Sequence, residues 1–226
     1  MRTPRFRSLA AVAIAALVVA LVSAVAQAQT DVAASLYGAF SGATSGNGTV
    51  QSPANQAGGM IELRHIANPL LGFEATYSFN RANETYRTQG VLCPAMDCGT
   101  VLESVSNNAH EITGDWVPSL HVANLRPFGV LGAGLLLDVP ATSQATIFTR
   151  TCAACGVTTT ASPTQTSTKP VFVYGAGLDW GLLPHIGLRL QYRGNLYSAP
   201  NVTKEFSSAN TFLHTSEPMI GLYFRL

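Results

Sequence analysis

The chain has 226 residues, 47% of them hydrophobic, and its 13 Lys and Arg nearly balance its 12 Asp and Glu. Lysine is scarce, with Lys169 and Lys204 the only two in the chain. Binding along a phosphate backbone needs clustered basic side chains, so this composition argues against a nucleic-acid partner.

The first 28 residues have the layout of a secretory signal peptide. A basic start precedes an apolar run over residues 9–22, and Ala26-Gln27-Ala28 supplies a small-residue cleavage motif. The alternative interpretation is a transmembrane anchor, but the run is short and a cleavage motif follows it. Removal of 1–28 leaves 198 residues with ten basic and twelve acidic side chains, a formal charge of −2. We therefore expect an exported protein whose mature domain is 29–226.

After the leader, no segment supplies the roughly 20 apolar residues that a spanning helix needs. The best candidate, 128–137, is about half that length and stops at Asp138. A chain can still cross a bilayer with strands of about 9–11 residues, provided that they close into a barrel and so satisfy every backbone N–H and C=O.

Eight segments show the alternation of such strands. In the clearest, Leu188 and Leu190 fall on one face while Arg189 and Arg193 fall on the other. We interpret the apolar face as lipid-facing and the polar face as interior, the reverse of a soluble sandwich. The predicted strands are 31–40, 58–65, 70–81, 110–117, 126–138, the two halves of 170–197 around the Leu183-Pro184-His185 turn, and a last strand that runs to the C-terminus.

The connections between these strands alternate between long and short. The long ones are 41–56, 82–107, 139–168 and 198–210. Porin-like proteins place short turns on the periplasmic side and long loops outside, which fits an even number of strands. The sequence therefore predicts an all-β fold, an eight-stranded antiparallel up-and-down transmembrane β-barrel whose interior is filled by side chains.

Four segments carry a resemblance to a known family: 126–134 (RPFGVLGAG), 174–180 (YGAGLDW), 188–193 (LRLQYR) and 221–226 (GLYFRL). They resemble the small outer-membrane β-barrels of the OmpA, OmpX and opacity-protein type. The resemblance implies the outer membrane of a Gram-negative-type bacterium, with outer-membrane lipid and the barrel-assembly machinery as partners. Family members usually end in an aromatic residue, whereas this chain ends in Leu226, two positions after Phe224.

The polar faces of the predicted strands place ten charged side chains in one narrow lumen. Confined charges must pair, because an unpaired charge in low dielectric costs several kcal/mol. One interpretation is a static ionic plug that fixes strand register. The other is a gated ion path, in which Arg189 or Arg193 changes partners among Glu74, Glu111 and Asp115. The predicted lumen network is Glu62, Arg64, Glu74, Glu111, Asp115, Asp179, Arg189, Arg193, Glu217 and Arg225.

The four cysteines form two local pairs in long loops, Cys93 with Cys98 and Cys152 with Cys155. Exported chains meet an oxidising periplasm, so we expect a disulfide within each pair, at the tip of a hairpin that continues beyond the membrane. Three alternatives stay open: bridges between the two loops, a zinc site using all four thiolates, and a C-x-x-C redox centre.

Residues 214–216 (His-Thr-Ser) resemble the His-x-Ser pairing of outer-membrane lipid A deacylases, with Glu217 as the adjacent carboxylate. A lone His beside a hydroxyl at a strand end is more simply an interfacial polar residue, so we expect no catalytic residue. The remaining histidines show no metal-ligand spacing, and we expect neither a metal nor a cofactor. Interface-belt positions are expected for Tyr77, Trp116, Tyr174, Trp180 and Tyr192.

Three function classes remain open from the sequence. The favoured one is a non-enzymatic structural or surface-interaction protein that meets an extracellular partner through loops 82–107 and 139–168. The alternatives are a narrow ion-conducting pore and an enzyme that modifies outer-membrane lipid.

Overall fold

Eight antiparallel strands close on themselves into a barrel in the computed structural model, which describes residues 28–88, 100–142, 144–150, 157–204 and 206–226. Closure is direct, because Val32 of the first strand pairs with Leu63 on one side and with Phe224 of the last strand on the other. None of the described residues forms a helix long and apolar enough to cross a membrane. The barrel strands, in order around the ring, are β1 (Gln29–Ser41), β4 (Gln56–Asn68), β5 (Leu71–Thr88), β6 (Thr100–Trp116), β7 (Leu125–Pro140), β10 (Ser167–Gly181), β11 (Ile186–Ser198) and β12 (Phe212–Arg225). The predicted eight-stranded barrel is confirmed.

Side chains alternate between the two faces of the barrel wall, with apolar groups outside. On β11, Leu190 is 45% exposed while the neighbouring Arg189 is fully buried. On β5 the outward side chains are apolar or aromatic up to Phe79 and become polar from Arg81 onward. The outward face is therefore an apolar belt that ends at Phe79 on this strand, as expected for strands that face hydrocarbon.

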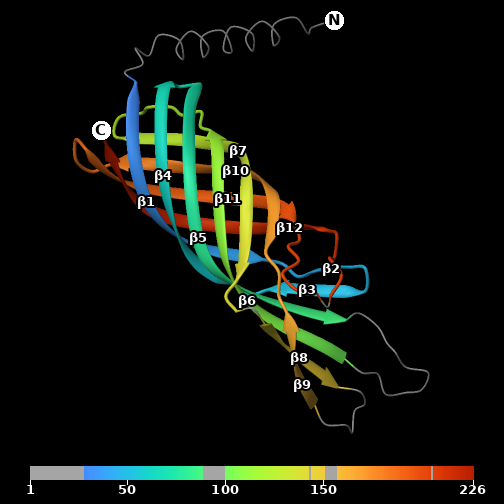
Figure 1. Cartoon of the computed structure of the whole chain (residues 1–226). Helices are drawn as coiled ribbons and strands as arrows, with labels where there is room; N and C mark the ends of the chain where they lie inside the picture. The colour runs from blue at the N-terminus through green and yellow to red at the C-terminus, as the bar shows by residue number, and fades with distance from the viewer. Residues whose placement is uncertain (1–27, 89–99, 143, 151–156, 205) are drawn as a thin grey trace, which may run out of the picture.

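The two ends of the barrel differ. The start of β1 and the C-terminus lie at one end, together with the short connections; we call this the turn end (Figure 1). At the opposite, loop end, β5 and β6 stay paired well beyond the apolar belt, as far as Arg87 and Leu102. The extension of these two strands carries two further hairpins into the same sheet (Figure 1).

One of these hairpins, β2 (Thr44–Gly46) with β3 (Thr49–Pro53), lies within 41–56, which the sequence pattern assigned to a loop. Asn47 and Gly48 form its two-residue turn, and both have positive φ, the conformation that Asn-Gly accepts most readily. β3 pairs with the end of β5.

The second hairpin, β8 (Gln144–Arg150) with β9 (Val157–Pro163), lies within 139–168, and its strand β8 pairs with the start of β6. Its register sets 146–149 against 158–161. Together, β2, β3, 81–88 of β5, 100–108 of β6, β8 and β9 make what we call the loop-end sheet.

Residues 199–204 and 206–211, between β11 and β12, fold back over the mouth of the barrel; we call them the cap. Val202 and Phe206 of the cap are buried against Tyr86 and Val105 from the extended β5 and β6. Polar contacts reinforce this packing, since the Tyr86 hydroxyl donates to the Pro200 carbonyl (3.1 Å). The cap therefore covers the loop end of the lumen rather than standing free in solvent.

Candidate functional site

Nine charged side chains from seven barrel strands fill the turn-end half of the lumen. Arg189 is the centre of this group, since Nε donates to Asp179 (2.7 Å) and Nη2 to Asp31 (2.8 Å), while Nη1 contacts Glu62. Arg126 reaches the same two aspartates, at 2.7 Å from Asp31 and 2.6 Å from Asp179. We call the group the ionic plug: Asp31, Glu62, Arg64, Glu74, Asp115, Arg126, Asp179, Arg189 and Arg193.

Strand register brings opposite charges face to face in the ionic plug. Asp179 lies directly across from Arg189 on one side and from Arg126 on the other. Arg64 likewise lies across from Glu74. Opposite charges at directly opposed positions of antiparallel strands attract, so these pairs favour the observed register over a slip by one residue.

Close aromatic packing completes the ionic plug. The Arg64 guanidinium stacks over the ring of Phe128 at 4.0 Å, and a cation above an aromatic face is attracted by its quadrupole. The ring lies against Gly177, where a Cβ would come within 2.3 Å of it. Gly132 makes a similar approach possible for Asp115. Gly177 and Gly132 therefore leave room for the Phe128 ring and the Asp115 carboxylate, and a larger side chain at either position would collide with them.

Each arginine of the ionic plug faces at least one carboxylate within 4.0 Å. Arg193 extends the group toward the loop end, with Nη1 at 3.0 Å from Asp115 and Nη2 at 3.6 Å from Glu111. A buried charge loses several kcal/mol of hydration, which only well-placed partners offset. The planar arginine fork supplies several donors in fixed directions, so one side chain can satisfy carboxylates from different strands.

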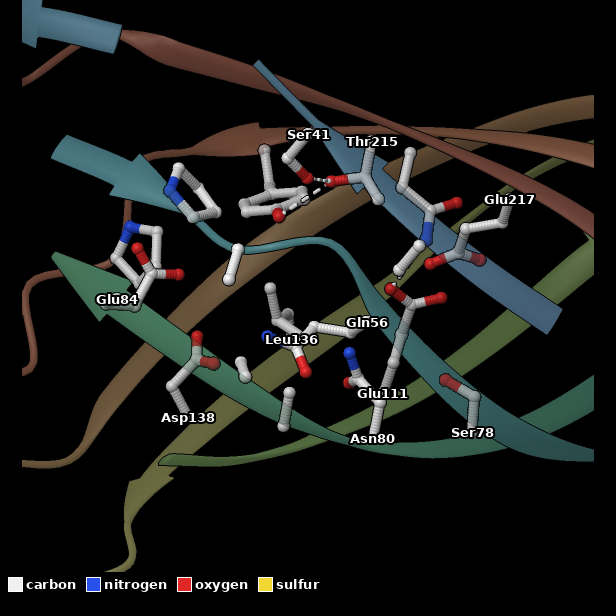
Figure 2. A pocket seen from close by; sticks show the side chains of 18 of the residues that line it. Ser41, Gln56, Ser78, Asn80, Glu84, Glu111, Leu136, Asp138, Thr215 and Glu217 are labelled. Carbon is white, nitrogen blue, oxygen red and sulfur yellow. Dashed lines mark hydrogen bonds between the residues drawn. The ribbon is translucent and has the colours of Figure 1, made fainter. Parts of the chain in front are cut away.

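A second polar region lies between the ionic plug and the cap: an internal cavity of about 50 Å³. Four carboxylates line it, and Figure 2 shows Glu84 and Asp138 on one side of the view and Glu111 and Glu217 on the other. Amide and hydroxyl side chains, among them Gln56 and Thr215, complete the lining. We call this space the acidic cavity.

Glu84 lies on the part of β5 beyond the apolar belt. Burial raises the pKa of its carboxyl to about 8, partly offset by the hydrogen bond that Gln51 Nε2 donates to it (3.1 Å). Asp138 adds to the rise in this pKa through like-charge repulsion. Among the described residues, no Arg, Lys or His nitrogen lies within 4.0 Å of the Glu84 carboxylate, whereas every carboxylate of the ionic plug has an arginine nitrogen within that distance.

The structure places the ten side chains of the predicted lumen network as follows. Eight of them enter ion pairs: Glu62, Arg64, Glu74, Glu111, Asp115, Asp179, Arg189 and Arg193. Glu217 is buried in the acidic cavity and has no Arg, Lys or His nitrogen of the described residues within 4.0 Å. Arg225 is half-buried near the C-terminus, likewise without a carboxylate partner among the described residues.

Sequence reasoning missed five buried charges. The inward position of Asp31 could have been predicted, because Asp31 lies on the same face of β1 as Ser35 and Tyr37. The inward position of Arg126 could not be predicted, because glycines and inward apolar residues such as Phe128 interrupt the alternation of polar and apolar residues on β7. The others are Glu84, Glu103 and Asp138; the first two lay in a segment interpreted as loop.

The His-Thr-Ser segment does not assemble into a catalytic group. His214 and Ser216 both face outward, and each bonds to a tyrosine: His214 Nε2 lies 2.8 Å from Tyr174 Oη, and Ser216 Oγ lies 3.1 Å from Tyr192 Oη. Glu217 points to the opposite face, into the lumen. Across the described ranges, no group of three or more His, Cys, Asp or Glu is arranged to hold a metal ion.

The expected disulfides, Cys93 with Cys98 and Cys152 with Cys155, lie outside the described residues and stay predictions.

The sequence matches the family model described as "Outer membrane protein beta-barrel domain" over residues 14–213. The chain belongs to this family. It is therefore an outer-membrane β-barrel, and the apolar belt faces the lipid of that membrane. No curated protein matches the sequence significantly.

Several solved outer-membrane barrels are similar to this member of the family. Neisserial surface protein A matches with 16% identity and a TM-score of 0.44, over 88% of this chain and 99% of that one. OprG from Pseudomonas aeruginosa matches with 11% identity and a TM-score of 0.44, over 89% and 97%. Ail of Yersinia pestis, in complex with the heparin analogue sucrose octasulfate, matches with 12% identity and a TM-score of 0.34, over 88% and 97%.

Proposed function

We propose that this outer-membrane barrel is a non-conducting, non-enzymatic surface protein that contacts an extracellular partner through its loop-end sheet. The observation that carries the proposal is closure of the lumen at both ends, by the ionic plug at the turn end and by the cap at the loop end. A barrel closed in this way has no continuous water route, so its activity is expected on its outer surface.

The loop-end sheet supports the second half of the proposal. Its strands come largely from 82–107 and 139–168, the two segments predicted from the sequence to meet an extracellular partner. Within the described sheet, β2 and β9 are the two terminal strands of the pairing order. β2 lies against the cap, where Asn47 Nδ2 donates to the Ser208 carbonyl (2.9 Å), so β9 is the strand whose backbone edge is offered to a partner. With short turns in the periplasm, this sheet projects from the cell.

The enzyme alternative receives less support. A lipid-modifying site built on His214 and Ser216 needs a carboxylate beside the histidine, and Glu217 lies on the other side of the barrel wall. Incubation with lipid A followed by mass spectrometry tests this, and any change in acyl composition would establish the enzyme instead.

The pore alternative is tested by conductance in planar bilayers. We expect no discrete channel events from the refolded barrel across physiological voltages, because four paired arginines occupy the lumen. Discrete events that change on Arg189→Ala would replace the proposal with the gated ion path. Empty detergent micelles and a barrel refolded with Arg87→Ala, on the exposed face of β5, serve as controls.

A further inference from the structure

The acidic cavity has a charge balance unlike that of the ionic plug below it. Among the described residues ten buried carboxylates face only four buried arginines, all four of which belong to the ionic plug. The excess of negative charge gathers toward the loop end, where Glu84, Asp138 and Glu217 line the cavity without a cationic nitrogen within 4.0 Å. Buried carboxylates without partners are costly, so either protons or a cation must neutralise them.

Unpartnered oxygens point to what occupies the cavity. Asn195 is 1% exposed and donates its amide Nδ2 to Glu111 Oε2 (2.9 Å), while its own Oδ1 accepts no hydrogen bond. Glu111 Oε1 and Glu217 Oε2 also lack donors. Arg193, the nearest cation, donates to Asp115 and Thr113 and stays 3.6 Å from Glu111.

Carboxylate and amide oxygens without donors are the ligands that hard cations prefer. The cavity of about 50 Å³ also has room for a few waters, since one water needs about 10–15 Å³ of such volume. No described group of three acids is arranged to coordinate a metal ion alone, so an ion here retains part of its water shell.

We propose that the acidic cavity binds one hard divalent cation of the Ca²⁺ type, held by Glu111, Asn195 and Glu217 together with retained waters. The ion sits between the ionic plug and the cap and offsets the negative charge that the arginines leave uncompensated. Ca²⁺ tolerates irregular sets of six to eight oxygen ligands, which suits side chains from β6, β11 and β12 supplemented by water.

Terbium luminescence tests the proposal, because Tyr37 and Tyr197 line the cavity and can sensitise a bound lanthanide. The barrel is refolded from urea into detergent with Tb³⁺ present, so that entry into a closed barrel does not limit loading. We expect tyrosine-sensitised emission that Ca²⁺ displaces, and a higher unfolding midpoint in Ca²⁺ than in chelator.

Matched variants make the test specific. Glu217→Gln removes no ion pair among the described residues and is expected to fold. It is expected to bind Tb³⁺ at least about tenfold more weakly, because a charged ligand is lost. Glu103→Gln, a buried carboxyl outside the cavity lining, is expected to bind like the parent. A gel shift on boiling verifies the fold of each variant.

Two results would overturn the cation site. The first is absence of sensitised emission from the folded parent barrel, which leaves protons and water as the occupants. The second is emission that persists undiminished in the folded Glu217→Gln variant, which places the ion elsewhere.

Discussion

Arg189→Met is expected to lower the free energy of unfolding by about 3–5 kcal/mol, the cost of leaving buried carboxylates without their partner. Three nitrogens of Arg189 face carboxylates from three strands, with the closest contacts to Asp179, Asp31 and Glu62. Methionine fills part of the volume but donates no hydrogen bond. Arg126 and Arg64 still contact Asp179, so the barrel is expected to close but to be less stable.

Urea titration in detergent, read by the gel shift between folded and boiled protein, measures this loss. Arg87→Met on the exposed face of β5 is the control, with an expected change within about 0.5 kcal/mol. Arg189→Lys is expected to recover little, since one ammonium cannot replace three donors held in a plane. A stability of Arg189→Met equal to that of the control would show that the ionic plug contributes nothing to the fold.

Leu190→Arg is expected to cost about 2–4 kcal/mol, the range for a charge on the lipid face of a barrel near the bilayer midplane. Leu190 is 45% exposed on β11, pairs with Ile220 of β12, and lies between belt positions on both sides. The guanidinium cannot reach the lumen from this position, because successive side chains of a strand point to opposite faces.

Folding yield into vesicles and the urea midpoint provide the measurement. Ser104→Arg is the matched control, an exposed outward position on β6 beyond the apolar belt, where an arginine is expected to be tolerated. Equal stabilities for the two variants would mean that Leu190 does not face hydrocarbon.

The sequence could predict the fold because the period-two pattern is sufficient for a barrel of this size. The alternation on β11 places Leu188 and Leu190 on the outer face and Arg189 and Arg193 on the inner face. The same rule applied to β1 would have placed Asp31 in the interior. The Asn47-Gly48 turn was a second signal available in the sequence, since Asn-Gly between short strands indicates a hairpin.

Other features depend on three-dimensional contacts that no local pattern encodes. Arg126 of β7 forms an ion pair with Asp31 of β1 across the lumen, although β1 and β7 are not adjacent strands. From the sequence the cap resembles an ordinary surface loop, because just two large apolar side chains of its described residues, Val202 and Phe206, pack into the lumen mouth. The separation of the lumen charges into a paired ionic plug and an acidic cavity likewise depends on how far each side chain lies along the barrel axis. The alternation of a strand predicts which side chains face the lumen, but not which side chains of other strands lie at the same level.

The central claim is that apolar side chains face lipid while ionised ones fill the interior, and the two native tryptophans test it most directly. Trp116 and Trp180, the only tryptophans in the chain, both point outward at the turn end, 40% and 46% exposed. In vesicles, we expect strong quenching of their fluorescence by lipids brominated on the acyl chain near the headgroup, and weak quenching by aqueous iodide. Efficient iodide quenching with no effect of brominated lipid would contradict the account.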